Sequence, residues 1–393
     1  MNFLQLDTYY YLQVKGIEHA KYGQNLISLR AQTHLNLLHV IVGSGSCANH
    51  GLDVNYDFQI KSADAHHAIE KGEIEFVGGN HISTYGHRAR GDKWVYLGQT
   101  LNSVHPKLVV RPDSGINGIA DLRGKRIGTT GHHPSLNDWL LLKQRGLDED
   151  RDDYEFVREV KGATTPDYAD QLSGEAAERV KKLRRKPLWT WVRDGEVVAA
   201  FLLAPAHLFA QDAGLKVIDV DLLPMIWYTT ISSGLPFVQK HPDIVERFLK
   251  GIIEGIHFFK TRPEESIRII QTRYDKEGKL NLPQATYIYQ ELAPLLEPRL
   301  YPSMNAIANV FEEAKREDSD AGKINPMELW DMHHVRHIDD SGFISNLYRK
   351  RDVRADKDQK DPEYRREQKQ KREAAIAAVK ACGHPIGEDC GCE

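Results

Sequence analysis

Residues 68–79 read AIEKGEIEFVGG, and this stretch decides the fold because a helical pattern passes directly into a strand pattern. Gly72 ends the predicted helix, and the apolar, β-branched run at 74–77 predicts a short buried strand. Gly78–Gly79 then stops that strand. A helix followed by a buried strand is the repeating unit of α/β proteins, in which helices cover parallel strands.

The same alternation continues on both sides of this stretch. It predicts strands at 26–30, 51–58, 94–97, 107–111, 126–128, 197–203 and 227–232, with helices that begin near Thr33, Ser62, Ser135 and His241. The chain leaves a first lobe after residue 110 and returns near 225, so we expect two crossings between lobes. The predicted fold is α/β, with lobe 1 at 1–110 plus 225–348 and lobe 2 at 111–224. Each lobe is a mostly parallel sheet flanked by helices, and the charged tail 349–393 is helical or disordered.

Composition excludes several function classes. The 393 residues carry 52 Lys+Arg against 56 Asp+Glu, which leaves no basic surplus of the kind that nucleic-acid binding requires. No apolar run approaches the roughly 20 residues of a membrane-spanning helix, so membrane insertion is not expected. The first residues, MNFLQLD, lack the pattern of an export signal, and the chain has only four cysteines. These features predict a cytoplasmic location.

Several ordered strings resemble the substrate-binding proteins of the sulfonate, nitrate and thiamine-precursor class. They are GLDV at 51–54, AIEKGEIE at 68–75, DLRGKRIG at 121–128, DGEVVAA at 194–200, TTISS at 229–233 and HPD at 241–243. This resemblance implies the type II periplasmic-binding-protein fold, with a ligand held in a cleft between two lobes that two crossover strands join. A small acidic ligand fits such a cleft, because helix N-termini present unpaired N–H groups to an anion.

A narrower resemblance is to cytoplasmic desulfinases that act on 2'-hydroxybiphenyl-2-sulfinate. Their active-site histidine precedes a pair of glycines by the separation that His66 keeps from Gly78–Gly79 here. Their nucleophilic cysteine corresponds to Gln32 or Thr33, and their anion-binding arginine falls on Phe76. Sulfinate cleavage by that chemistry is therefore not predicted, although the position of the pocket is.

The candidate site residues lie where strands end at the predicted cleft. We assign catalytic roles to His66 and His81, and ligand binding to Thr33, His34, Gly78, Gly79, Asn80, His132, His133 and His207. Simpler interpretations stand beside these assignments. His66 can be a solvated helix residue, Gly78–Gly79 a tight turn, and His207 part of a helix cap.

Metal binding receives no assignment. The tail gathers three thiols and an imidazole at Cys382, His384, Cys390 and Cys392, but their spacing matches no zinc motif. His333, His334 and His337 fit a packed helix, and Cys47 has no evident base beside it. We predict no metal and no cofactor.

These features support two functions. The first is a cytoplasmic enzyme that acts on a small, preferentially aromatic acid, a lyase such as a decarboxylase in which histidines transfer protons. The alternative is a solute-binding protein of an ABC transporter, with a permease as partner, or a small-molecule sensor. Because one fold hosts both binding and catalysis, the sequence leaves open whether the protein is an enzyme.

Overall fold

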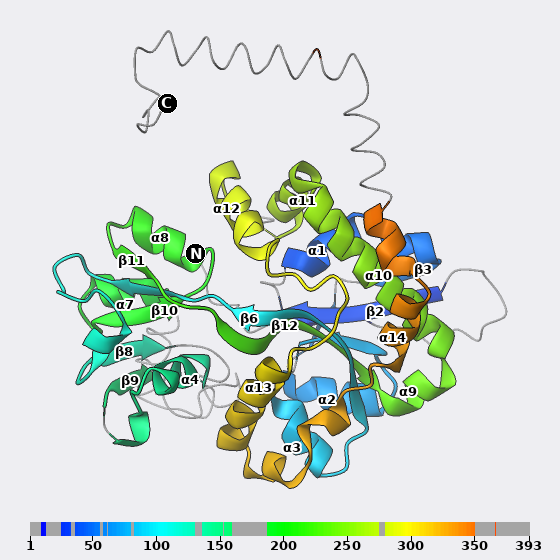
Figure 1. The fold of residues 1–393 in the computed structure, drawn as a ribbon, viewed down its shortest axis with the longest axis horizontal. Helices are drawn as coiled ribbons and strands as arrows, with labels where there is room; N and C mark the ends of the chain where they lie inside the picture. Colours follow the sequence, from blue (N-terminus) through cyan, green and yellow to red (C-terminus); the bar gives the residue numbers. More distant parts are fainter. Residues whose placement is uncertain are drawn as a thin grey trace. The chain divides into compact units, whose positions relative to one another are not determined.

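The computed structural model describes residues 9–12, 25–32, 36–55, 58–60, 62–79, 82–129, 136–151, 153–158, 187–274, 280–349 and Arg366. The chain divides into two compact units, Met1–Ile338 and Asp339–Glu393. The first unit contains two β-sheets (Figure 1). Within the described ranges, no helix has both the length and the apolar character that crossing a bilayer requires.

The first sheet mixes parallel and antiparallel pairs of strands. β2 (Asn25–Gln32) pairs in parallel with β3 (Leu52–Asn55) and with β5 (Phe76–Gly78). β1 (Tyr9–Leu12) and β4 (Phe58–Ile60) pair with each other antiparallel. Helices α1 (Asn36–Gly43) and α2 (Ser62–Glu70) lie between these strands in the sequence, as the alternating pattern predicts. The single strand predicted at 51–58 is instead two strands, β3 and β4.

Two long strands link the sheets. β6 (Trp94–Val104) and β12 (Leu223–Gly234) pair antiparallel along their whole length, from Trp94 opposite Gly234 to Val104 opposite Leu223. β12 also pairs with β5 in the first sheet. β6 continues into β7 (Lys107–Val110) of the second sheet, and β12 follows β11 (Lys216–Asp219) from that sheet. Figure 1 shows both long strands running side by side between the sheets.

The second sheet has five strands in the order β11-β7-β10-β8-β9. β8 (Arg126–Thr129) pairs in parallel with β9 (Glu155–Arg158) and with β10 (Ala199–Leu202), whereas β7 is antiparallel to β10 and β11. β8 and β10 fall within or next to the runs predicted at 126–128 and 197–203. Parallel pairing means that β8 and β10 end at the same edge of the sheet.

Helix α10 (Pro242–Thr261) has the apolar face that its sequence predicts. Ile244, Phe248, Ile252 and Ile253 are all buried at helical spacing. A β-carbon at Gly255 would lie 2.4 Å from Ile41 Cγ1 and 3.1 Å from Ile41 Cα, so only glycine lets α1 pack this closely.

The remaining helical elements are listed here with their bounds. They are the α-helices α3 (Ser83–Ala89), α4 (Leu136–Gln144), α7 (Leu188–Arg193), α8 (Ala206–Asp212), α9 (Leu235–Lys240), α11 (Pro263–Ile269), α12 (Leu282–Leu292), α13 (Met304–Glu317) and α14 (His333–Asp340). The short 3-10 helices are η1 (Ala48–His50), η2 (Ile119–Leu122), η3 (Glu149–Arg151), η5 (Ser319–Lys323) and η6 (Pro326–Leu329), and η4 (Ile270–Tyr274) is a π-helix.

Candidate functional site

The residues predicted from sequence divide into two groups. Thr33, His34, Asn80, His81, His132 and His133 lie outside the described residues, as does the Cys/His tail. The structure describes the other four, His66, Gly78, Gly79 and His207. Gly78 and Gly79 lie at the end of β5, and His207 lies just beyond the end of β10.

Gly79 ends β5 directly against the long strand β12. Its φ of +126° lies in the region that favours glycine, and its N–H donates to the carbonyl oxygen of Thr230 over 3.0 Å. The Thr230 hydroxyl in turn donates to Gln99 Oε1 over 2.8 Å, which ties β12 to β6. The predicted turn at Gly79 is therefore held against the strands that link the two sheets.

The Thr229 hydroxyl stands out among the buried polar groups of β12. Thr229 has no exposed surface, and its Oγ1 has no hydrogen-bond partner among the described residues. Thr100 does not satisfy that hydroxyl, because its own Oγ1 donates to the Thr229 carbonyl oxygen over 3.0 Å. A buried hydroxyl without a partner costs free energy, so it is a candidate donor for a bound molecule. The sequence analysis treats Thr229 only as part of a resemblance string.

Two carboxyl groups lie at the edge of the second sheet where β8 ends. The Thr129 hydroxyl donates to Asp138 Oδ2 over 3.3 Å, and Asp138 lies close enough for its charge to affect Glu313 on α13. Burial raises the pKa of Asp138 to about 7. Burial, and then the charge of Asp138, raise the pKa of Glu313 well above its usual value. Both groups therefore keep their protons to a higher pH than exposed carboxyl groups do, and neither was singled out from sequence.

His207 lies on the same edge, on helix α8. It is 2% exposed, and its ring contacts the Tyr287 ring edge to face at 5.3 Å between centroids. Burial lowers its pKa, so the imidazole stays neutral. A charged group lies nearby, since Lys107 Nζ is 2.8 Å from Asp219 Oδ1 and 3.4 Å from Glu291 Oε2. His207 thus lies after β10 in a position that is compatible with ligand binding and with packing.

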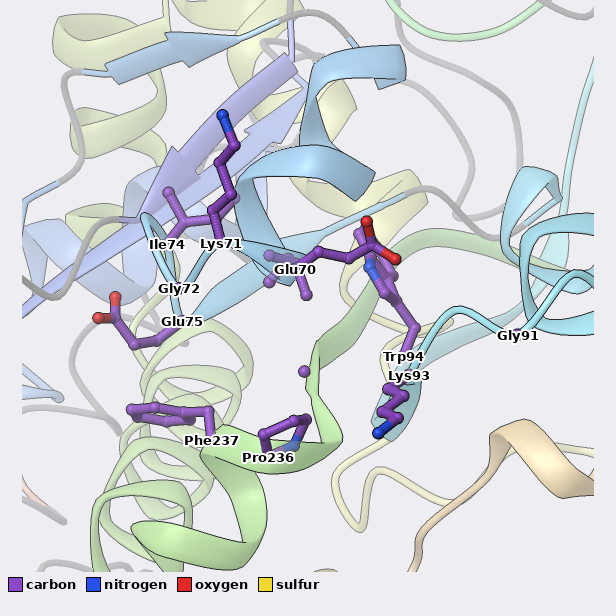
Figure 2. Close-up of a pocket in the computed structure, with 12 residues that line it drawn as sticks. Glu70, Lys71, Gly72, Ile74, Glu75, Gly91, Lys93, Trp94, Pro236 and Phe237 are labelled. Carbon is purple, nitrogen blue, oxygen red and sulfur yellow. The ribbon is translucent and has the colours of Figure 1, made fainter.

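A pocket of about 480 Å³ lies at the other end of β5. Figure 2 shows its lining, with Glu70 and Lys71 from the end of α2, Lys93 and Trp94 from the start of β6, and Phe237 from α9. Phe76 is paired with Ser233 near this end, whereas Gly78 is paired with Ile231 toward the other. The pocket is therefore separate from the strand ends at which the sequence predicts the ligand.

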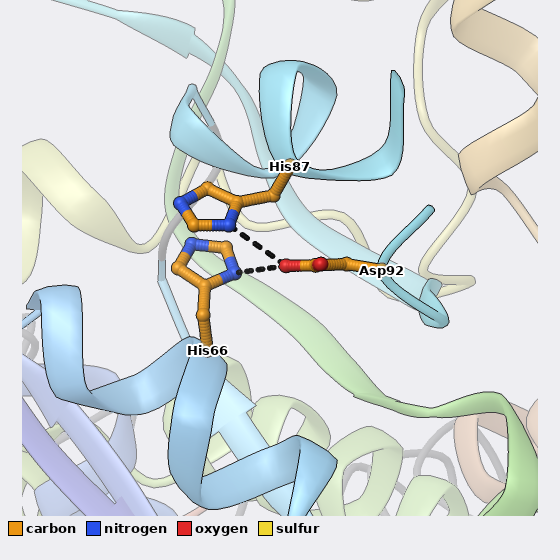
Figure 3. A group of neighbouring side chains, drawn as sticks. All are labelled: His66, His87 and Asp92. Atoms are coloured by element: carbon orange, nitrogen blue, oxygen red, sulfur yellow. Dashed lines mark hydrogen bonds and ion pairs between the residues drawn. The ribbon is translucent and has the colours of Figure 1, made fainter. Parts of the chain in front are cut away.

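His66 lies in a compact cluster with His87 and Asp92 (Figure 3). The two imidazole rings stack with 3.6 Å between centroids and 5° between planes. Asp92 Oδ2 lies 2.7 Å from His87 Nδ1 and 3.9 Å from His66 Nδ1. His66 is 4% exposed, and burial lowers its pKa to about 3, with smaller contributions from His87 and Arg90. The alternative of a solvated His66 is therefore wrong.

Two other groups bear on metal binding and nucleophilic chemistry. Asp331, His333 and His334 form a second cluster of ligand atoms at the start of α14. Cys47 is buried, and burial followed by the charge of Glu254 raises the pKa of its thiol to about 12. A thiol with such a pKa is not a nucleophile at neutral pH.

Comparison with known proteins supports the fold. Residues 45–176 match a family model described as NMT1/THI5 like. The sulfonate-binding protein SsuA from Methylobacillus flagellatus KT superposes with a TM-score of 0.55 at 13% identity, covering 81% of this chain and 94% of that one. SsuA from Xanthomonas axonopodis pv. citri, bound to MOPS, gives 0.53 at 14% identity, covering 80% and 99%. This chain has the type II periplasmic-binding-protein fold.

The periplasmic-binding-protein fold also occurs in an enzyme that this chain resembles. DSZB in complex with biphenyl-2-sulfinic acid superposes with a TM-score of 0.50 at 16% identity, covering 78% of this chain and 96% of that one. Both resemblances stated from sequence are thus confirmed. A comparison with curated proteins finds no match.

The comparisons correct two predictions made from sequence. The main functional hypothesis, a cytoplasmic lyase of the decarboxylase type, is wrong, because the family match and the SsuA structures favour the binding-protein alternative. The cytoplasmic location is wrong for the same reason, since those structures are of periplasmic proteins. Phe76 bears instead on the resemblance to desulfinases. At the position of the desulfinase arginine it is fully buried, with its ring 4.1 Å from that of Phe248.

Proposed function

We propose that this protein is the solute-binding component of an ABC transporter, that it acts in the periplasm, and that its ligand is a small organic acid of the sulfonate or carboxylate type. The ligand would lie between two lobes, residues 1–110 plus 225–348 and residues 111–224. The lobes close around it, and an ABC permease is the partner that receives it. The SsuA structures support this choice of ligand class.

The arrangement of strand ends is the observation that carries the proposal. Ligands of open α/β sheets bind beyond the carboxyl ends of parallel strands. Here β5 ends beside the linking strands, next to Gly79, and the parallel strands β8 and β10 end at Thr129 and Leu202. Below about pH 7, the protonated Asp138 adds no negative charge to that edge. An acidic ligand therefore meets neutral hydrogen-bond donors there.

The Thr229 hydroxyl gives this proposal a specific test. Thr229→Val removes the hydroxyl but keeps the shape of the side chain, and Thr229→Ser keeps the hydroxyl. We expect the valine variant to bind the ligand about 10-fold more weakly, the loss that one hydrogen bond typically causes, and the serine variant to bind almost normally.

The experiment begins with a thermal-shift screen of aliphatic and aromatic sulfonates and carboxylates, including MOPS. Each hit is then measured by calorimetry with the wild type and both Thr229 variants. The function is overturned if no acid in the panel raises Tm or binds by calorimetry. Equal affinity of the valine variant and the wild type overturns only the role of Thr229.

A further inference from the structure

The His66–His87–Asp92 cluster contains a ring nitrogen that no atom of the cluster hydrogen-bonds. His66 Nδ1 is buried and has no hydrogen-bond partner among the described residues. It lies 3.9 Å from Asp92 Oδ2, which is too far for a hydrogen bond. The other ring nitrogen, Nε2, is 3.1 Å from Ser83 Oγ. When that nitrogen carries the proton, the Nδ1 lone pair faces a carboxylate oxygen, and a cation between them removes the repulsion.

The distances within the cluster suit a small metal ion. The ligand atoms of the three residues all lie within 4.8 Å of one another. A tetrahedral Zn²⁺ with bonds of about 2.0–2.1 Å separates its ligand atoms by about 3.3 Å. The two Nδ1–Oδ2 distances, 2.7 Å for His87 and 3.9 Å for His66, lie on either side of that value. Figure 3 shows both rings directing Nδ1 toward the same carboxylate. Because the rings stack almost in parallel, one ring has to turn out of the stack before both Nδ1 lone pairs can point at one ion.

Glu70 lies beside the cluster and would become a fourth ligand once its carboxylate turns toward the ion, since it is not among the three residues whose ligand atoms already lie within 4.8 Å of one another. It follows His66 by four residues on α2, so both side chains lie on one face of the helix. Its carboxyl group lies close enough to that of Asp92 for Asp92 to raise the pKa of Glu70. Glu70 also lines the pocket of about 480 Å³, as Figure 2 shows, so this one side chain borders both the pocket and Asp92 of the cluster.

We propose that His66, His87, Asp92 and Glu70 form a binding site for Zn²⁺ or a similar divalent transition metal. Two imidazoles and two carboxylates are a donor set that such ions accept, and they leave the bound site with no net charge. The ion would join α2, α3 and the turn before β6, which carry the ligands. Gly79 lies between α2 and α3 in the chain, so the ion would fasten the elements on both sides of the predicted ligand-binding turn.

The test uses the full chain with Cys382, Cys390 and Cys392 replaced by serine, because the tail thiols could bind zinc themselves. The protein is treated with EDTA, dialysed and titrated with Zn²⁺ by calorimetry, and Co²⁺ is added in parallel to record its visible spectrum. We expect one Zn²⁺ per chain, a higher Tm, and the intense absorption of tetrahedral Co²⁺.

The variants are chosen among residues with some exposure, so that folding is preserved. His87→Gln and Asp92→Asn should each weaken Zn²⁺ binding by about 100-fold, and Glu70→Gln by about 10-fold. The control is His333→Ala, which removes a ligand from the second His/Asp cluster and should leave binding unchanged. The proposal is overturned if the serine variant binds no Zn²⁺, or if the folded His87→Gln and Asp92→Asn proteins bind it as tightly as their parent.

Discussion

The buried carboxyl group of Glu313 makes a quantitative prediction about stability. Glu313 has no exposed surface, and neither carboxyl oxygen has a hydrogen-bond partner among the described residues. Burial and the nearby Asp138 raise its pKa well above 4.5. Glu313→Gln keeps the size of the side chain and removes its titration.

The free energy of unfolding depends on pH because the folded and unfolded chains bind the Glu313 proton differently. Above about pH 5 the unfolded chain has lost the Glu313 proton while the folded chain keeps it, so the free energy of unfolding falls as pH rises. One proton corresponds to about 1.4 kcal/mol per pH unit, so the loss between pH 5 and 7 has an upper limit of about 3 kcal/mol. A glutamine at position 313 does not titrate, so this fall in the free energy of unfolding with rising pH disappears. Relative to the wild type, the free energy of unfolding of Glu313→Gln should therefore rise between pH 5 and 7, by up to about 3 kcal/mol.

The assay is urea unfolding of the wild type and Glu313→Gln at pH 5, 6 and 7, at constant ionic strength. Glu264→Gln is the control, because Glu264 is an exposed glutamate in the first turn of α11 and should leave the pH dependence almost unchanged. If Glu313→Gln and the wild type show the same pH dependence, Glu313 is already ionised in the folded protein, and our account of this carboxyl pair is wrong.

Three further predictions concern packing and titration. Gly255→Ala should lower the free energy of unfolding by about 2 kcal/mol in urea, because its β-carbon would lie 2.4 Å from Ile41 Cγ1, whereas Gly322→Ala meets no atom closer than 3.8 Å and should have little effect. The lowered pKa of His207 means that its contribution to stability is present above pH 6.5 and is lost as pH falls below that value. An NMR titration should accordingly show the His207 ring taking up its proton at a lower pH in the folded protein than in the urea-unfolded chain, and protonation at the same or a higher pH would contradict this. Because burial raises the pKa of Cys47 to about 12, iodoacetamide at pH 8 should leave the Cys47 peptide unmodified in the native protein and modify it in urea, as peptide mass mapping would show.

The local sequence pattern was sufficient to predict much of the fold. The helix-to-strand passage at 68–79, the apolar face of α10 and the strands at 107–110 and 126–129 follow from periodicity and from glycine positions. The full lengths of β6 and β12 were missed. They pair with each other across more than a hundred residues of sequence, and such pairing leaves no local signal.

The candidate sites were less predictable. His66 was singled out by its separation from Gly78–Gly79, but His87 and Asp92 join it only because α3 and the following turn pack against α2. Glu313 did leave a signal, since it interrupts the apolar face that Ile307, Val310 and Ala314 form on α13. A charged residue on such a face indicates a buried titratable group, and the periodicity could have been used to find it.

The most direct test of the proposed function is calorimetric titration of the purified protein with the acid that raises its Tm most, followed by NMR of the recovered ligand. A solute-binding protein should bind one ligand per chain and release it chemically unchanged after prolonged incubation. Conversion of the acid by the wild-type protein, or the absence of binding by any sulfonate or carboxylate, would contradict the account.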